Sequence, residues 1–351
     1  MLIGDDGTLP LPWLAAPLAQ GLQSQRGHAL MLHGAAGNGV LPFALALAQS
    51  WLCEAADGRR PACGRCGSCR LVQGHVHPDL MLLMPEQQRR DHEWPLPGDK
   101  PEGDGSRKPS RQIRVDEVRS LIDWVFKTSA RGRGKVAVLT PGEAMNPQSA
   151  NALLKTLEEP PPGTRLIVTT PDPQRLLPTV RSRCQTLRLA DPESGTAQAW
   201  LAARGVAEPA VLLAAAAGRP LDALALHQAG MQADAWRQLP QALAQGQGRA
   251  VQGWSPPQLL DLLLKLCHDA MAVAGGAAPR YFPQGSVPSG ASPARLRAWS
   301  LELQRIARHA AHPWNEGVLA DALVAAAARA LQPRAAHPGG PRRAGLDTRP
   351  A

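Results

Sequence analysis

The sequence predicts an α/β domain with a parallel sheet in its first half and an all-helical second half. Short apolar runs alternate with helical patterns, as buried strands of a parallel sheet do, at residues 28–34, 79–84, 135–140 and 165–170. After about residue 190 the strand patterns stop, and Ala and Leu recur at helical spacing to about residue 333. Since strands that alternate with helices favour a sheet covered on both faces, the first half is expected to be a layered α/β domain.

Length, composition and charge exclude several classes of protein. The chain has 351 residues, 44% of them hydrophobic, which is enough for a sizeable core and two or three domains. Its start carries Asp5 and Asp6 and no basic segment, so no secretory signal is expected, and no apolar run is long enough to predict a membrane span. We therefore expect a soluble cytoplasmic protein. Its net charge of +9 permits nucleic-acid or acidic partners but equally fits a solvated basic surface.

The turn after the first predicted strand has the glycine spacing of a phosphate-binding P-loop. Residues 34–41 read GAAGNGVL, whereas a working loop reads G-x-x-x-x-G-K-[ST]. Val40 replaces the lysine that grips the phosphates, and Leu41 replaces the hydroxyl that holds magnesium. The N-terminus of the helix predicted at 42–52 still favours an anion, but a tight turn that binds nothing fits as well, and we expect no bound ATP. The positions of this degenerate loop are Gly34, Gly37, Gly39, Val40 and Leu41.

Four cysteines follow the predicted helix at 42–52 with the spacing of a metal site. Residues 53–69 read CEAADGRRPACGRCGSC, and the two-residue gaps allow successive thiolates to face one ion. Disulfides are the alternative, but an intracellular chain keeps its thiols reduced, and three cysteines this close cannot all pair comfortably. With four thiolates the shell is closed, so His75 and His77 nearby are expected to be surface or packing residues. We predict a structural Zn²⁺ ion held by Cys53, Cys63, Cys66 and Cys69.

Two helices and a charged insert are predicted between the later strands. Residues 85–111 are rich in Pro, Gly and charge, which is typical of a flexible solvated loop. Asp116 can cap a helix whose apolar positions 118, 121, 122 and 125 share one face. Asn146 and Pro147 form an N-cap and first-turn pair for a helix with an apolar stripe at 150, 153, 154 and 157.

The third predicted strand lacks the acidic pair of an ATPase. A P-loop ATPase carries Asp-Glu at the end of this strand to hold magnesium and to activate water. Here the strand ends in Thr140 and Pro141, and the nearest carboxylate, Glu143, lies beyond a Pro-Gly turn. Together with the replacements at positions 40 and 41, this joint loss indicates that the chain does not hydrolyse nucleotide.

At residues 151–184 the sequence resembles the AAA+ clamp-loader family of bacterial DNA polymerase III. The segment reads NALLKTLEEPPPGTRLIVTTPDPQRLLPTVRSRC. The resemblance rests on NALLKTLEEPP, on RSRC, on the four-cysteine insert after the loop helix and on the order of all three. It covers about residues 10–333 and leaves out the insert at 85–111 and the basic, aperiodic tail at 334–351, which is expected to be disordered.

The resemblance implies three domains and a set of partners. Residues 1–190 are then a RecA-like AAA+ domain with a zinc module, residues 191–232 a small helical lid, and residues 233–333 an all-α collar that joins subunits into a hetero-pentameric ring. The implied partners are the delta and tau/gamma clamp-loader subunits and, through the complex, the sliding clamp and primer-template DNA. No membrane is implied, and the complex belongs to the DNA-directed DNA polymerase holoenzyme.

The same resemblance implies a non-catalytic subunit. The ATP-hydrolysing members of the family keep the P-loop lysine and the Asp-Glu pair, and they also offer a lid arginine in a G-x-x-R element. Here the corresponding residues 218–221 read GRPL and place Leu221 at the arginine position. The loop is then a remnant of ATPase ancestry in a subunit kept for its interfaces.

Arg183 in RSRC is the candidate for acting on a neighbour. In the family, the arginine of the SRC element reaches across an interface to the γ-phosphate bound by the adjacent subunit. A guanidinium suits this task because it stays charged and grips two oxygens. The resemblance therefore implies a trans arginine finger at Arg183, whereas the residues alone favour a surface arginine or one paired with a nearby carboxylate.

Two other functions are weighed against this one. A motor-type (tau/gamma-like) clamp-loader ATPase would need different residues at positions 40, 41, 140 and 141. A free-standing zinc-dependent nucleic-acid-binding protein would need a basic stripe with interleaved aromatic side chains, and only 4% of the residues are aromatic.

Overall fold

The computed structural model describes residues 2–25, 27–94, 109–308 and 315–333, and the chain divides into two compact units. The first unit comprises Met1–Val206 and Gly218–Leu224, and the second comprises Ala207–Ala217 and Ala225–Ala351. Residues of the predicted lid, 191–232, therefore fall in both units, and the division into three domains stays a prediction. The predicted tail at 334–351 lies outside the described residues.

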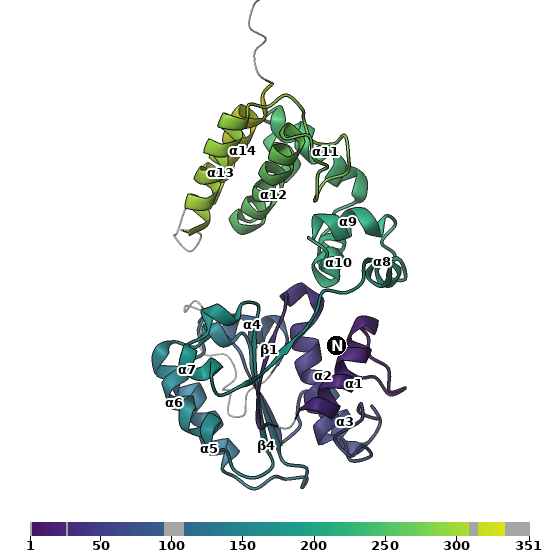
Figure 1. Ribbon diagram of the computed structural model, residues 1–351, viewed down its shortest axis with the longest axis vertical. Coiled ribbons are helices and arrows are strands. Elements are labelled where there is room, and N and C mark those ends of the chain that lie inside the picture. The colour runs from purple at the N-terminus through teal and green to yellow at the C-terminus, as the bar shows by residue number, and fades with distance from the viewer. Residues whose placement is uncertain (1, 26, 95–108, 309–314, 334–351) are drawn as a thin grey trace, which may run out of the picture. The chain divides into compact units, whose positions relative to one another are not determined.

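A five-stranded parallel sheet forms the centre of the first unit (Figure 1). The strands are β1 (Ala29–His33), β2 (Leu80–Leu83), β3 (Lys135–Leu139), β4 (Thr164–Thr170) and β5 (Gln185–Arg188), in the order β2-β3-β4-β1-β5. The four strands predicted from apolar runs are confirmed. The edge strand β5 was missed because its sequence, QTLR, is polar and mostly exposed.

Helices cover both faces of this sheet, as the alternating pattern predicts (Figure 1). On one face α2 (Val40–Leu52) packs on the strands, with α1 (Ala15–Ser24) and α3 (Gly67–Gln73) against it. On the other face lie α5 (Val115–Val125), α6 (Pro147–Glu158) and α7 (Pro178–Arg181). The predicted apolar stripes are confirmed, because positions 118, 121 and 125 of α5 and 150, 153 and 157 of α6 are buried in the core.

Short 3-10 turns occur at η1 (Pro12–Leu14), η2 (Ala36–Asn38), η3 (Gly142–Ala144), η4 (Pro173–Arg175) and η5 (Gly248–Val251).

One predicted helix cap is confirmed and the other is wrong. The side chain of Asn146 accepts a hydrogen bond of 2.8 Å from the backbone N–H of Ser149 and caps α6. Asp116 does not cap α5, because the helix already begins at Val115 and Asp116 lies in its first turn. The carboxylate of Glu117 takes the capping contact instead, accepting 2.7 Å from the backbone N–H of Arg114.

The charged insert is not entirely a loop. Its first residues form α4 (Glu86–Asp91), and Glu86 pairs with Arg90 at 3.0 Å and with Arg114 at 2.8 Å. The pair with Arg114 ties the start of the insert to the beginning of α5. Residues 95–108 of the insert lie outside the described residues.

The second unit is helical throughout the part that the structure describes. Its helices are α9 (Pro209–Ala215), α11 (Ala233–Ala244), α12 (Pro256–Ala274), α13 (Pro293–Arg308) and α14 (Glu316–Leu331). Helix α8 (Ser194–Ala202) belongs to the first unit, and α10 (Pro220–Gln228) has residues in both units. Its core includes Trp236, which stacks on Phe282 at 4.8 Å between ring centroids. The fully buried carboxylate of Asp269 accepts backbone N–H groups of residues 280–282 and so anchors the segment that joins α12 to α13.

Within the described residues, no individual helix is both long enough and apolar enough to cross a membrane, and only the bent pair α9 and α10 passes such a test by length and composition.

Candidate functional site

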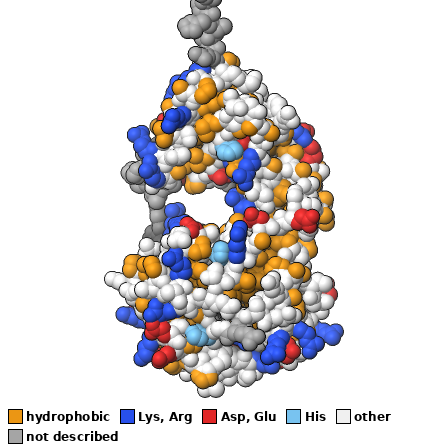
Figure 2. All heavy atoms as spheres, viewed as in Figure 1, with side chains coloured by type: hydrophobic (Ala, Val, Ile, Leu, Met, Phe, Trp, Pro, Cys, Tyr) orange, Lys and Arg blue, Asp and Glu red, His pale blue; other side chains and the backbone are white. Residues whose placement is uncertain are grey.

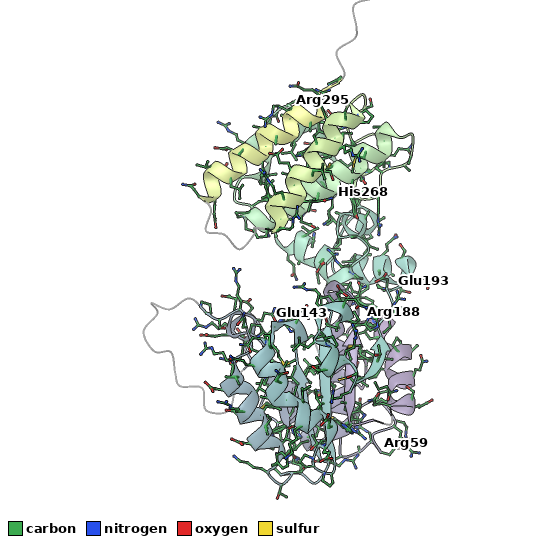
Figure 3. The ribbon with its side chains drawn as sticks, turned by 60° about the vertical axis from the view of Figure 1, so that its left-hand side comes forward. Arg59, Glu143, Arg188, Glu193, His268 and Arg295 are labelled. Atoms are coloured by element: carbon green, nitrogen blue, oxygen red, sulfur yellow. The ribbon has the colours of Figure 1, made fainter. Side chains whose placement is uncertain are left out.

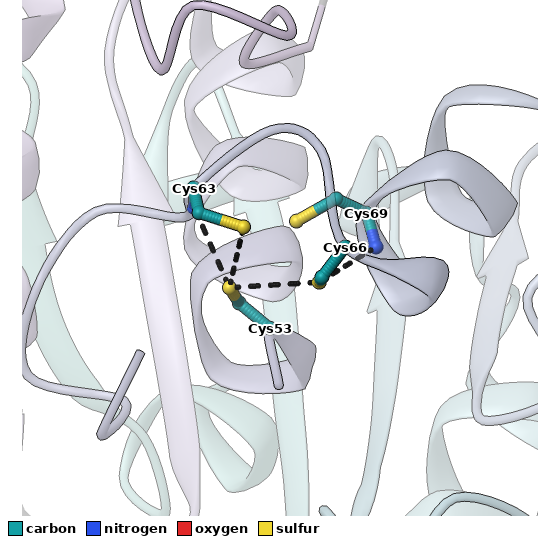
Figure 4. A group of neighbouring side chains, drawn as sticks. All are labelled: Cys53, Cys63, Cys66 and Cys69. Atoms are coloured by element: carbon teal, nitrogen blue, oxygen red, sulfur yellow. Dashed lines mark hydrogen bonds between the residues drawn. The ribbon is translucent and has the colours of Figure 1, made fainter. Parts of the chain in front are cut away.

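The four cysteines of the predicted metal site lie together (Figure 4). Cys53 ends α2, Cys63 lies in the loop that follows, and Cys66 and Cys69 stand at the N-cap and in the first turns of α3. All four sulfur atoms lie within 4.8 Å of one another, and all four cysteines are free thiols. The group can therefore hold a metal ion.

The sulfur positions fit a tetrahedral ion. The Sγ atom of Cys53 lies 3.6 Å from that of Cys63 and 3.8 Å from that of Cys66. A zinc ion about 2.3 Å from each sulfur, at the tetrahedral angle, requires sulfurs roughly 3.8 Å apart. Two backbone N–H groups also point at sulfurs, from Cys63 to Cys53 at 3.4 Å and from Cys69 to Cys66 at 3.5 Å.

The protein environment acts differently on the individual thiols. Burial raises the pKa of the Cys53 thiol, and burial together with the neighbouring thiols raises that of Cys69. Burial also opposes ionisation of Cys66, but the backbone N–H groups of Cys69 and Glu54 outweigh it and lower the pKa of Cys66 to about 7. A bound cation would favour the thiolate form of all four, since metal coordination deprotonates a thiol.

A polar network connects the cysteine module to the edge of the sheet. Nε of Arg131 donates to Glu54 at 2.8 Å and to Ser68 at 3.0 Å, and Ser68 in turn contacts Nε2 of His77 at 3.2 Å. The bond from Arg131 keeps the pKa of Glu54 below its usual range. His77 is buried and also accepts the backbone N–H of Asp79 at 3.0 Å. It is a packing residue, as predicted, and His75 stacks on Trp94 instead of approaching the cysteines.

Asp79 completes this connection just before β2. Its fully buried carboxylate accepts the backbone N–H groups of Ala130 and Arg131, each at 2.8 Å, and lies 3.6 Å from Nζ of Lys135. Burial would raise the pKa of Asp79, but these donors outweigh it and lower the pKa. The loop that carries Arg131 is thereby fixed to the first residues of β2 and β3, and the cysteine module is held in place by strand geometry.

The degenerate loop after β1 lies between a strand and a helix N-terminus, which is the position of a phosphate-binding turn. Gly39 has φ of +96°, a left-handed conformation that favours glycine, and α2 begins at the next residue, Val40. However, the N–H groups of Asn38 and Gly39 already donate to carbonyl groups of Ala35 and Ala36, at 2.9 and 3.1 Å. These two donors are therefore committed within the loop and do not point to a ligand.

A carboxylate from the α10 segment lies against this loop. A β-carbon built on Gly37 would lie 2.5 Å from Oδ1 of Asp222, so only glycine leaves room for that side chain. Asp222 is also paired with Arg219. Beside the loop, Val40 is buried in the core, where a P-loop lysine would need to reach a phosphate. The space next to Gly37 is thus filled by an acidic side chain of the chain itself.

The end of β3 presents hydroxyl groups in place of the acidic pair. Thr140 is buried, and its Oγ1 atom accepts a hydrogen bond of 2.6 Å from Thr169 at the end of β4. Thr140, Pro141, Val40 and Leu41 all line one cavity of about 490 Å³ at the carboxyl ends of the strands. The structure therefore brings together four of the positions at which the sequence departs from an ATPase, and Leu221, a fifth, lines the same cavity.

Arg183 lies apart from this cavity, in the turn between α7 and β5. Its guanidinium forms an ion pair with Glu158 at the end of α6, and its Nη1 atom donates 2.9 Å to the carbonyl oxygen of Thr179. The side chain is 32% exposed. The structure thus places Arg183 at the surface with an intramolecular partner, and its role as a trans finger stays a prediction.

Several features of the site were not apparent from the sequence. Asp222 was not singled out in the sequence, because nothing local indicates its contact with Gly37. The network through Arg131 joins residues up to 77 positions apart. A pairing of Arg183 with a nearby carboxylate was foreseen as an alternative, but its partner, Glu158, was not.

Comparisons with known proteins place these features in a family. Residues 14–193 match the family model described as DNA polymerase III, delta subunit. DNA polymerase III subunit delta' of Pseudomonas aeruginosa is 40% identical over 227 residues, which cover 63% of this chain and 62% of the relative. The match therefore spans a little less than two thirds of that protein.

Two further relatives carry the same name. Subunit delta' of Yersinia pestis is 36% identical over 273 residues, covering 74% of this chain and 72% of the relative. Subunit delta' of Escherichia coli K12 is 32% identical over 309 residues, covering 82% and 85%. The similarity to these proteins thus extends well beyond the α/β unit.

The cysteine group gives a prediction that metal analysis can check. Purified protein is expected to contain about one metal ion per chain, and Cys66→Ser is expected to lower that content and the temperature of thermal unfolding, because metal binding contributes to the folding free energy. Cys184→Ser is the control, since Cys184 lies outside the group. A native, metal-free protein of unchanged stability would contradict the assignment.

Proposed function

Since the chain belongs to the family of DNA polymerase III delta' subunits, we propose that it is a non-catalytic subunit of the clamp loader, which uses ATP to load the sliding clamp onto primed DNA. The absence of catalysis is inferred from the joint replacement, around one cavity, of four positions that bind phosphate and magnesium in an ATPase. Val40 and Leu41 replace the phosphate and magnesium ligands, and Thr140 and Pro141 replace the acidic pair.

Two contacts support the absence of nucleotide binding. The side chain of Asp222 fills the space beside Gly37, and the loop N–H groups of Asn38 and Gly39 are bonded within the loop. Leu221, at the position of the lid arginine in ATP-hydrolysing relatives, contributes another apolar side chain to the cavity. A triphosphate would meet neither a cation nor free N–H donors from these residues.

The metal proposed for the cysteine module is zinc, with a structural role. Four thiolates at tetrahedral spacing are typical of closed zinc sites that leave no position for water or substrate. Arg131 and Asp79 connect this module to the start of two strands. Loss of zinc is therefore expected to disturb the edge of the sheet as well as the module.

The proposed partners follow from the family. The chain would join delta and tau/gamma subunits in a cytoplasmic hetero-pentameric ring, with the helices of residues 233–333 as its collar, and would meet the clamp and primer-template DNA through that complex. Arg183 would then serve as a trans arginine finger. The ion pair with Glu158 would hold the guanidinium extended at the surface until a neighbour's nucleotide competes for it.

The two alternative functions have less support. A motor-type ATPase is disfavoured by the four replaced positions around the cavity. A free-standing nucleic-acid-binding protein would be expected to carry a basic stripe with stacked aromatic side chains. On the face drawn in Figure 2, Lys and Arg side chains are dispersed among other residues and do not form one stripe.

The first prediction from this function concerns ATP. The isolated chain is expected to show no ATP hydrolysis and negligible affinity for ATP, and Val40→Lys alone is expected to leave turnover absent, because the magnesium ligands are still missing. Phosphate release and titration with labelled nucleotide check these expectations. Hydrolysis above a buffer blank that persists through repurification would show the proposal to be wrong.

The second prediction concerns Arg183 in the reconstituted complex. Arg183→Ala is expected to leave the chain folded and able to assemble, but to slow DNA-stimulated ATP hydrolysis at one site and with it clamp loading. Arginine fingers in well-studied cases contribute about 10³ to 10⁵ in rate at the site that they serve. Turnover and clamp loading should be measured side by side in the wild-type and mutant complexes.

The control for this experiment is Arg181→Ala. Arg181 lies two positions away and bonds to Gln174 at 2.9 Å within its own chain. The Arg181→Ala variant is expected to leave the rates of ATP hydrolysis and clamp loading unchanged. If the Arg183→Ala complex assembles and keeps wild-type rates, Arg183 is a surface residue paired with Glu158 and is no finger.

A further inference from the structure

The cavity at the carboxyl ends of the strands is a feature that a purely structural subunit does not require. Its volume of about 490 Å³ lies within the range of small-molecule sites, which is roughly 300–1,000 Å³. Residues that follow β1, β2, β3 and β4 contribute to its wall, so the cavity is built on a rigid scaffold. The residues at positions 40, 41, 140 and 141 change the lining from that of an ATPase without filling the space.

The wall is mostly apolar and includes aromatic surface. Trp94 is buried, lines the cavity and stacks on His75 at 4.0 Å between ring centroids. Further apolar surface in the wall comes from Val40 and Leu45 of α2 and from Leu82 of β2. A ligand with a flat apolar body would bury its surface against these side chains.

One charged group in this wall lacks a partner. Glu143, in the η3 turn after β3, lines the cavity, and its Oε2 atom is buried without any hydrogen-bond partner among the described residues. Figure 3 shows Glu143 at the end of the sheet that borders the cavity. A carboxylate in the wall of a mostly apolar cavity is costly, and a cation bound in the cavity would lower that cost.

The described lining contains His75 and His92 but neither lysine nor arginine, so a bound anion would meet the carboxylate of Glu143 and no permanent positive charge. This is the reverse of the charge that an ATPase presents at the same edge of a sheet. The hydroxyl groups of Thr140, Thr169 and Thr170 and the amide of Gln88 add neutral hydrogen-bonding capacity. The site therefore favours a cationic donor on an apolar body.

We propose that this cavity is a binding site for a small amphipathic cation, an amine, amidine or guanidine attached to a flat apolar group, with Glu143 as its counter-ion. The cationic end donates to the carboxylate of Glu143, and the apolar end lies between Trp94 and the side chains of α2 and β2. The proposal goes beyond clamp loading and does not depend on how the chain assembles with partners.

The test uses benzamidine as the probe and calorimetry with the full chain as the measurement. Benzamidine is expected to bind saturably at millimolar concentrations or below, whereas neutral benzamide and anionic benzoate are expected to bind at least about tenfold more weakly, because a charge-assisted hydrogen bond is lost. Glu143→Gln keeps the side-chain shape and is expected to weaken benzamidine binding by about tenfold or more.

Two further variants make the result decisive. Glu193→Gln removes a carboxylate that is exposed and absent from the cavity wall, and it is expected to leave binding unchanged. Leu41→Trp narrows the cavity at a partly exposed position and is expected to abolish binding while circular dichroism stays that of the wild type. Equal binding of benzamidine and benzamide, full affinity in Glu143→Gln, or no saturable binding to the wild type would overturn the proposal.

Discussion

The carboxyl edge of the parallel sheet, where the loop after β1 meets α2, is the constraint on which the rest depends. A strand, a glycine turn and a helix N-terminus in this order create a place that favours an anion. In this chain Val40 is buried at the start of the helix, Asp222 lies against Gly37, and Glu143 lines the adjoining cavity. The order of strand, glycine turn and helix is that of a phosphate site, whereas the side chains around it are apolar or acidic.

A chain that does not use nucleotide can still need this fold, because the fold positions other parts of the molecule. The sheet positions the turn that carries Arg183, and the loop of Arg131 fixes the cysteine module to the strands. Both features lie away from the cavity and do not require nucleotide in this chain. Changes in the cavity lining can therefore leave Arg183 and the cysteine module undisturbed.

Local patterns in the sequence were sufficient for much of this architecture. Apolar runs predicted β1 to β4, Asn146 predicted the cap of α6, and cysteine spacing predicted a group that the structure assembles within 4.8 Å. The features that were missed depend on contacts between distant segments. Strand β5 is polar because it lies at the sheet edge, and the contact of Asp222 with Gly37 joins residues that only the fold brings together.

The central claim is that this chain is a non-catalytic member of a clamp-loader ring, and native mass spectrometry tests it most directly. The chain should be mixed with the delta and tau/gamma subunits of its own organism, without and with ATP. The account predicts a single hetero-pentameric species that contains one copy of this chain and no nucleotide bound to it. A chain that stays alone in every mixture, or that binds ATP itself when isolated, would contradict the account.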